Sequence, residues 1–153
     1  MNTEKLYIAD SHNKEHLSLL KDFEQKEEIG NIFTNQLEKE GNPDENIIDQ
    51  QLFLYEKEVT DVCQIQGEKD RKVCALFLAP LKTPPKKRRL LTLAIDYIFN
   101  ALQMESLHIS VKENDKILRQ DLENRGFENL GMESGLIIYL KEKEEEKQIG
   151  RII

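Results

Sequence analysis

Residues 72–80, KVCALFLAP, form an apolar run of strand length that ends in a proline. The next ten residues, LKTPPKKRRL, hold two further prolines and five basic side chains, and a stretch with an apolar stripe follows at 90–102. A run this apolar is typical of a central strand that is covered on both faces, and proline does not fit the interior of a helix or a central strand. The segment therefore predicts a central strand, then a basic loop, then a helix.

The chain before this segment predicts a strand, two helices and a hairpin. KLYIA at 5–9 alternates as a strand does, and 10–27 begins with capping residues and continues with apolar residues at helical spacing. A second short helix is expected at 31–41. Residues 51–66 are strand-type, and GEKDR at 67–71 is typical of a hairpin turn. Two or three antiparallel strands fit this region.

The chain after the basic loop predicts alternating helices and strands. The apolar stripe of 90–102 indicates a helix, SLHISV at 106–111 alternates as a strand, 112–127 is amphipathic, and GLIIYLK at 135–141 is a last strand. This order predicts an α+β fold in α/β/α layers, with a mixed, mostly antiparallel central sheet of about six or seven strands and about four helices.

The length of 153 residues suits a single domain, expected at 1–141. The charged segment at 142–153 is expected to be a tail, either a frayed helix end or disordered, because such charge density buries nothing.

Composition and charge exclude several functional classes. No apolar run approaches the roughly 20 residues of a membrane helix, and the N-terminus does not resemble a signal peptide, so we expect a cytoplasmic protein without a membrane partner. The net charge of −7 makes nucleic acid an unlikely partner. Cys63 and Cys74 lie in expected strands and are interpreted as buried thiols.

The histidines do not indicate a metal site. His12 and His16 share a helix face, but no third ligand has suitable spacing, so we interpret them as a surface pair and expect no metal. His108 alternates with apolar residues and is interpreted as structural.

A basic cluster in an acidic chain has two interpretations. Five of the 22 basic residues lie in 81–90, and the cluster is either a site for a small anion or a solvated loop: Lys82, Lys86, Lys87, Arg88 and Arg89. A charged run is usually solvated, but its place between a strand and a helix supports the anion site to a similar degree, so both interpretations stay open.

The segment 72–131 resembles the GNAT superfamily of acyl-CoA-dependent N-acyltransferases. The matching parts are the strand KVCALFLAP, the loop LKTPPKKR, the helix RLLTLAIDYIF, the segment SLHISVKEN and the closure LENRGFENLG. At the level of element order the resemblance covers nearly the whole chain. It implies the GNAT fold and acetyl-CoA as co-substrate.

The loop departs from the family pattern. Both of the family's phosphate-binding glycines are replaced, by Pro85 and Lys87, and proline has no N–H to donate. In one interpretation the charges of Lys82, Lys86, Lys87 and Arg88 replace the missing backbone donors at the start of the helix. In the other, the site is lost and the loop is solvated or contacts another anionic partner.

The family's proton donor is also replaced. The resemblance places Leu122 where many members carry a tyrosine that protonates the leaving thiolate, and leucine cannot do this. Tyr97 and Tyr139 are the spare phenols, and we interpret both as half-buried packing.

The resemblance assigns the remaining candidate residues. Main-chain N–H groups near Leu78 and Ala79 would hold the cofactor or polarise its carbonyl. Asn114 matches the capping asparagine that contacts the cofactor, although Asn114 or Asp115 also suits a plain N-cap. Glu56 and Glu58 would serve as general base for the amine, directly or through water.

The resemblance implies direct transfer of an acetyl group from acetyl-CoA to a primary amine of a small molecule or protein. The first two helices, the loop at 42–46 and the last hairpin would grip the acceptor. The alternative is a catalytically inactive binding or regulatory module, which the losses at Pro85, Lys87 and Leu122 favour. Docking of the basic loop onto RNA is a weaker third option. A monomer or homodimer is expected.

Overall fold

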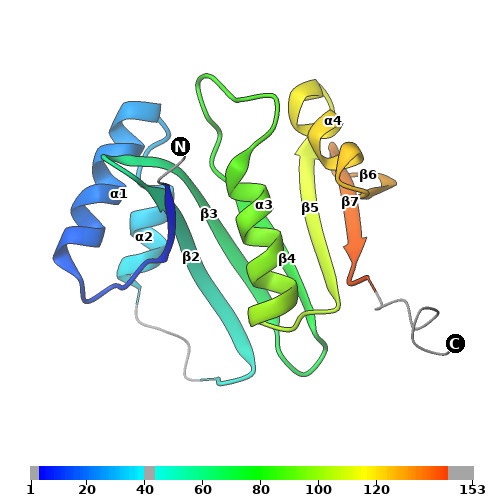
Figure 1. The fold of residues 1–153 in the computed structure, drawn as a ribbon, viewed down its shortest axis with the longest axis horizontal. Helices are drawn as coiled ribbons and strands as arrows, with labels where there is room; N and C mark the ends of the chain where they lie inside the picture. Colours follow the sequence, from blue (N-terminus) through cyan, green and yellow to red (C-terminus); the bar gives the residue numbers. More distant parts are fainter. Residues whose placement is uncertain (1–3, 40–43, 145–153) are drawn as a thin grey trace, which may run out of the picture.

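The computed structural model describes residues 4–39 and 44–144. In this part of the chain a seven-stranded sheet lies between helices (Figure 1). The strands are β1 (Lys5–Ile8), β2 (Ile47–Tyr55), β3 (Val59–Glu68), β4 (Val73–Leu78), β5 (Ser106–Lys112), β6 (Glu128–Glu133) and β7 (Leu136–Glu142). The helices are α1 (Lys14–Glu27), α2 (Ile32–Glu38), α3 (Arg89–Asp96) and α4 (Lys116–Asn124). Most of the expected tail at 142–153 and part of the expected loop at 42–46 lie outside the described residues.

The sheet is mixed and mostly antiparallel, as predicted. Its order is β1-β2-β3-β4-β5-β7-β6, and only the β4–β5 pair is parallel. The edge strand β6 was not predicted. All six of its residues are exposed, so its sequence ENLGME lacks the alternation of apolar and polar residues that marks a half-buried strand.

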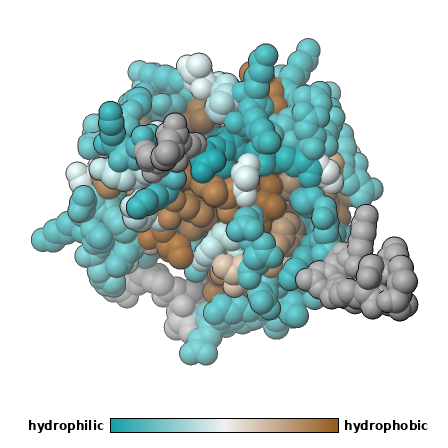
Figure 2. All heavy atoms as spheres, viewed as in Figure 1, coloured by the Kyte–Doolittle hydropathy of each residue, from teal (hydrophilic) through white to brown (hydrophobic). Residues whose placement is uncertain are grey.

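The two faces of the sheet bury separate apolar clusters, which confirms the three layers. One cluster joins the sheet to α3 and α4 through residues such as Leu76, Leu91 and Leu122. The other joins it to α1 and α2 through residues such as Leu20 and Phe33. Figure 2 shows hydrophobic side chains gathered in the middle of one face of the molecule, framed by hydrophilic ones. In the described part of the chain no helix is long and apolar enough to cross a membrane.

The prediction that both faces of β4 are covered is wrong. Cys74 and Leu76 are buried beneath α3, but Phe77, on the opposite face, is 47% exposed. The cluster beneath α1 and α2 takes side chains from β2 and β3 and, as far as the described residues show, none from β4 itself. The sheet surface around Phe77 is therefore open.

A buried carboxylate fixes α2 to α1. Glu24 lies on the buried face of α1, next to Phe23, and is only 1% exposed. Its carboxylate accepts the main-chain N–H groups of Phe33 and Thr34 at 2.8 and 3.2 Å and the Thr34 hydroxyl at 2.7 Å. These N–H groups open α2 and have no partner within the helix, so Glu24 acts as its N-terminal cap.

The helix predicted at 90–102 forms, but its geometry changes along its length. After α3 the chain continues as a π-helix over Tyr97–Ala101. The main-chain N–H of Leu102 donates to the carbonyl of Tyr97 at 2.9 Å, a spacing of five residues.

Candidate functional site

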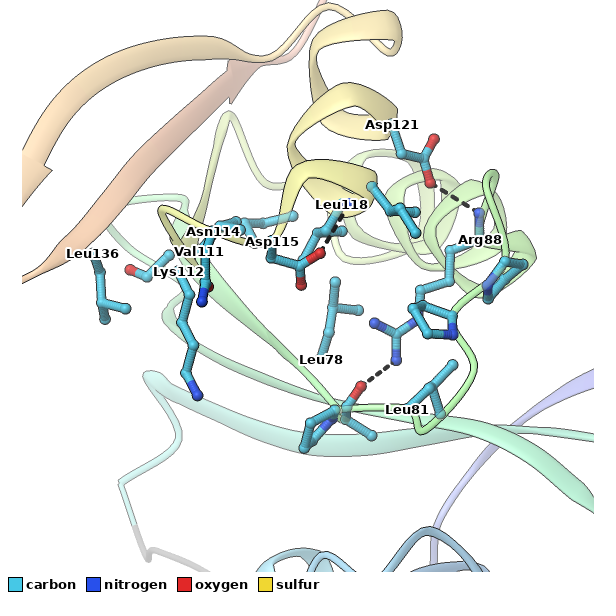
Figure 3. A pocket seen from close by; sticks show the side chains of 17 residues that line it. Leu78, Leu81, Arg88, Val111, Lys112, Asn114, Asp115, Leu118, Asp121 and Leu136 are labelled. Atoms are coloured by element: carbon cyan, nitrogen blue, oxygen red, sulfur yellow. Dashed lines mark hydrogen bonds between the residues drawn. The ribbon is translucent and has the colours of Figure 1, made fainter.

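The parallel strands β4 and β5 separate after three residue pairs. Their ladder runs from Val73 opposite Ser106 to Ala75 opposite His108 and then ends. A pocket of about 550 Å³ opens where they diverge (Figure 3). The end of β4 forms one wall, and Ile109, Ser110 and Val111 of β5 contribute to the other. The loop after β4 and the start of α4 complete the lining. We call this the β4–β5 pocket.

The main chain of β4 offers one of the two expected donors to the β4–β5 pocket. The N–H of Ala79 donates to the carbonyl of Val62 in β3 at 3.0 Å. The expectation for Ala79 as an N–H donor is therefore wrong, because the group is already used. Successive N–H groups of a strand point to opposite edges, so that of Leu78 points toward β5, beyond the end of the ladder.

Arg88 has a different role from the expected one. Its side chain is 7% exposed, and its Nε and Nη2 donate to the Asp61 carboxylate at 2.8 and 2.7 Å. Nη2 also donates to the carbonyl of Ala79. The guanidinium therefore ties the start of α3 to β3 and to the end of β4, and its donors are not directed at an external phosphate. Burial raises the pKa of the Asp61 carboxyl, although Arg88 acts to lower it.

Asp121 of α4 holds the same loop from the other side. Its Oδ2 accepts the main-chain N–H of Arg88 at 2.8 Å, and its Oδ1 accepts Arg125 Nε at 2.8 Å. Arg125 Nη2 also donates to the carbonyl of Arg88 at 2.8 Å. An internal carboxylate thus lies at the N-terminus of α3, where the helix dipole favours negative charge.

Sequence reasoning missed Asp61, Asp121 and Arg125. The available signals were weak: Asp61 interrupts an otherwise strand-like run, and Asp121 adjoins the apolar Leu122. A buried acidic residue requires a partner, but the sequence does not say which of the 22 basic residues supplies it.

The structure does not bring together Lys82, Lys86 and Lys87, the lysines expected to bind phosphate, at the β4–β5 pocket. The main-chain N–H of Lys82 donates to Glu27 at 2.8 Å, and its Nζ lies 3.0 Å from Glu28. Lys86 is exposed, and Lys87 lines a separate groove along α3. Pro84 and Pro85 line the β4–β5 pocket instead.

Asn114 lies where the sequence places it, at the β4–β5 pocket. Its side chain is seen at the opening in Figure 3. The N-cap of α4 is Asp115, whose carboxylate accepts the main-chain N–H of Leu118 at 3.2 Å. The capping role expected for Asn114 or Asp115 therefore falls to Asp115, and the Asn114 amide is not needed for it.

Glu56 and Glu58 lie in the turn between β2 and β3, and neither is among the described residues that line the β4–β5 pocket. The Glu58 carboxylate is 2.7 Å from Lys26 Nζ of α1, on the surface. Val62, which meets the end of β4, is four residues beyond Glu58, or about 13 Å along an extended strand. The structure therefore does not support a direct contact between the Glu56 or Glu58 carboxylate and a ligand bound at Leu78.

Leu122 and the two spare phenols have packing roles in the structure. Leu122 is fully buried. Tyr139 is fully buried and not half-buried as expected, and its hydroxyl donates to Glu123 at 2.6 Å and accepts from Arg119 at 3.2 Å. The Tyr97 hydroxyl donates to Gln50 at 2.6 Å. Burial raises the pKa of both phenols.

The cysteines are buried free thiols, as predicted. Burial raises the pKa of Cys63 and raises that of Cys74 to about 11, so neither is an activated nucleophile. Within 4–39 and 44–144, no group of three or more potential ligands could hold a metal ion.

Comparisons with known proteins give structural matches only. No protein-family model and no curated protein sequence matches the chain. The N-acetyltransferase PseH of Campylobacter jejuni superposes with a TM-score of 0.65 at 15% identity, over 94% of this chain and 100% of that one. A second structure of PseH, in complex with acetyl coenzyme A, matches at 14% identity and a TM-score of 0.65, over 92% and 99% of the two chains.

Two further matches have the same architecture. An acetyltransferase from Streptococcus agalactiae matches at 19% identity and a TM-score of 0.65, over 94% and 100% of the two chains. The dodecameric spermidine N-acetyltransferase of Vibrio cholerae matches at 12% identity and a TM-score of 0.63, over 91% and 93%. At these identities the likeness shows the fold, which is that of the GNAT acetyltransferases.

Proposed function

We propose that this chain is an acetyl-CoA-dependent N-acetyltransferase that acetylates a primary amine of a small molecule or protein. The observation that carries the proposal is the pocket between the diverging parallel strands β4 and β5, with an unpaired stretch of β4 main chain at its edge. The PseH structure with acetyl coenzyme A has the same fold, which supports the choice of co-substrate.

The inner part of the β4–β5 pocket fits the pantetheine arm of coenzyme A. The Leu78 main-chain N–H would bind a polar group of the arm, and Ile109 and Val111 would contact its apolar segments. The Asn114 amide at the opening would add a further hydrogen bond. When bound, acetyl-CoA supplies a thioester as the activated acetyl group. Because both thiols are buried and protonated, direct attack by the amine is favoured over an acylated cysteine.

The outer part of the β4–β5 pocket fits the pyrophosphate less well. Pro84 and Pro85 offer no N–H groups, and Asp121 already accepts the N–H of Arg88. We therefore assign the phosphates to the rim of the loop, where Lys86 and Lys87 are exposed. A catalytic role for Glu56 or Glu58 through bridging water stays a prediction.

We propose a cytoplasmic location for this protein. Two buried thiols without a disulfide suit the reducing cytoplasm. We infer a monomer or homodimer, whereas the matched spermidine N-acetyltransferase of Vibrio cholerae is dodecameric.

Titration of acetyl-CoA during thermal unfolding tests the proposal, because a ligand that binds the folded state raises the melting temperature. Ser110 is exposed and lines the β4–β5 pocket, so Ser110→Trp fills it without disturbing the core and is expected to abolish the shift. Ser18→Trp, at an exposed position of α1, is the matched control and should retain it. No shift of the unsubstituted protein at millimolar acetyl-CoA refutes the proposal.

A second candidate, a binding module without turnover, is favoured by one observation. Leu122 occupies the position of the family's proton donor and is fully buried. Release of free thiol from acetyl-CoA in the presence of candidate amines separates the two functions. Binding without thiol release supports the module.

A further inference from the structure

Four aromatic side chains gather at the β1 edge of the sheet, away from the β4–β5 pocket. Together with Glu15 and Leu19 they line a cavity of about 180 Å³, and none of these residues lines the β4–β5 pocket. We call it the aromatic cavity. Its rings belong to Tyr7 of β1, His16 of α1, and Phe53 and Tyr55 of β2.

One pair of rings is stacked, and the other two rings meet this pair edge-on. Tyr7 and Phe53 lie nearly parallel, with centroids 5.4 Å apart and planes inclined by 18°. Tyr55 meets Tyr7 at 78°, and His16 meets Phe53 at 79°. Phe53 is 1% exposed and backs the cavity, so the accessible walls belong to Tyr7, His16 and Tyr55, which a compact group can contact on more than one side.

The electrostatics of the aromatic cavity favour a cation. The faces of aromatic rings carry partial negative charge, and Glu15 adds a carboxylate. The main-chain N–H groups of Glu15 and His16 donate to Asn13 at 2.9 and 3.2 Å, so these positively polarised groups are already used. His16 Nδ1 accepts the main-chain N–H of Asp10 at 3.1 Å, so this N–H group is also already used. Among the described residues no lysine or arginine lines the cavity.

We propose that the aromatic cavity binds a methylated ammonium group. Aromatic walls with a nearby carboxylate recognise such cations through cation–π contacts, while the methyl groups bury apolar surface. The volume corresponds to roughly six water molecules, which suits a compact head group. The ligand class is a quaternary or methylated amine, and the site is independent of the proposed acetyl transfer.

Choline and its neutral isostere 3,3-dimethylbutanol test the role of charge. The N-methyl resonance of choline is expected to shift upfield on binding, because it enters the shielding region of the rings, with a dissociation constant in the millimolar range. The isostere is expected to bind about fivefold more weakly or worse. Equal affinity for both would show a merely apolar hollow and overturn the proposal.

Substitutions separate the contributions of the aromatic rings and of the carboxylate to choline binding. Tyr7 is 38% exposed, so Tyr7→Leu keeps apolar surface and should fold, but removes a ring face and should weaken choline binding about three- to fivefold. Glu15→Gln should weaken choline binding without affecting the isostere. Phe77→Leu, at an exposed aromatic residue outside the cavity, is the matched control. Unchanged choline affinity of both cavity variants, with unchanged melting temperatures, overturns the proposal.

Peptides distinguish the source of the ammonium group. Tighter binding of a trimethyllysine peptide than of choline assigns the group to a modified protein, whereas binding of choline alone assigns it to a small molecule. If an unmodified lysine peptide binds as tightly as its trimethylated counterpart, the assignment to a methylated ammonium is wrong.

Discussion

The guanidinium of Arg88 and the carboxylate of Asp61 form a bidentate ion pair inside the molecule, with N–O distances of 2.8 and 2.7 Å. Both side chains are more than nine-tenths buried. The pair fixes the loop that closes the end of β4. The ion pair stabilises the fold only when both partners are present, because burying one charge without its partner has an unfavourable free energy.

Asp61→Asn is expected to lower the free energy of unfolding by about 3–5 kcal/mol, because it leaves the buried Arg88 without its counter-charge. Urea unfolding measures the change. Glu58→Gln provides the matched control, since the Lys26–Glu58 pair is similarly short but exposed, and should cost less than about 1 kcal/mol. Equal losses for the two variants would show that the internal pair does not hold the loop.

Replacement of Pro85 by glycine should strengthen binding of acetyl-CoA. Pro85→Gly adds a main-chain N–H beside the β4–β5 pocket, and a hydrogen bond to a charged group is typically worth about 1.5–3 kcal/mol, or about 10- to 150-fold in affinity. Calorimetry with acetyl-CoA and with S-acetylpantetheine checks the cause. Only the ligand with a pyrophosphate should gain, and a gain for both would locate the effect elsewhere.

Glu24→Gln should destabilise the packing of α2 on α1. The substitution replaces an ionised acceptor of three hydrogen bonds with an amide that offers one oxygen, and we expect a loss of about 1–3 kcal/mol in unfolding free energy. Hydrogen exchange of the Phe33 and Thr34 amides should accelerate. Asp22→Asn, at an exposed position of the same helix, is the control and should change neither quantity.

Stability should fall as the pH rises from about 9 to about 11. In the unfolded chain the Cys74 thiol ionises near 9, whereas burial raises its pKa to about 11 in the folded protein. Between these values the folded state binds more protons, so alkali favours unfolding by about 1.4 kcal/mol per pH unit from this thiol. The slope of unfolding free energy against pH in Cys74→Ala should be shallower. An unchanged slope would assign the alkaline loss to other groups.

Most of the fold could be predicted because its elements are encoded by local patterns. The helices α1, α3 and α4 and strands such as β5 and β7 show clear periodicity in the sequence, and the structure confirms them. The strand β6 was missed because an exposed edge strand has no apolar face to reveal it. The open face of β4 was missed because the sequence does not show how far α1 and α2 extend across the sheet.

The candidate site was less predictable, because its side chains meet over long sequence distances. Leu78 and Asn114 lie within predicted elements, and both line the β4–β5 pocket. Arg88 was assigned to a phosphate, whereas its partner Asp61 lies 27 residues away and a different carboxylate, that of Asp121, accepts its main-chain N–H. A run of basic residues does not reveal which member turns inward.

The short β4–β5 ladder also affects how the molecule moves. Three residue pairs of the described ladder join β1–β4 to β5, β7 and β6, so main-chain hydrogen bonding divides the sheet into two leaves, while the apolar cluster beneath α3 and α4 takes side chains from both. We expect the leaves to open as separate cooperative units. A molecule bound along the free edge of β4 would act as an added strand and couple the leaves. Its arrival would then slow amide exchange in β7 as well as in β3, far beyond the groups that it touches.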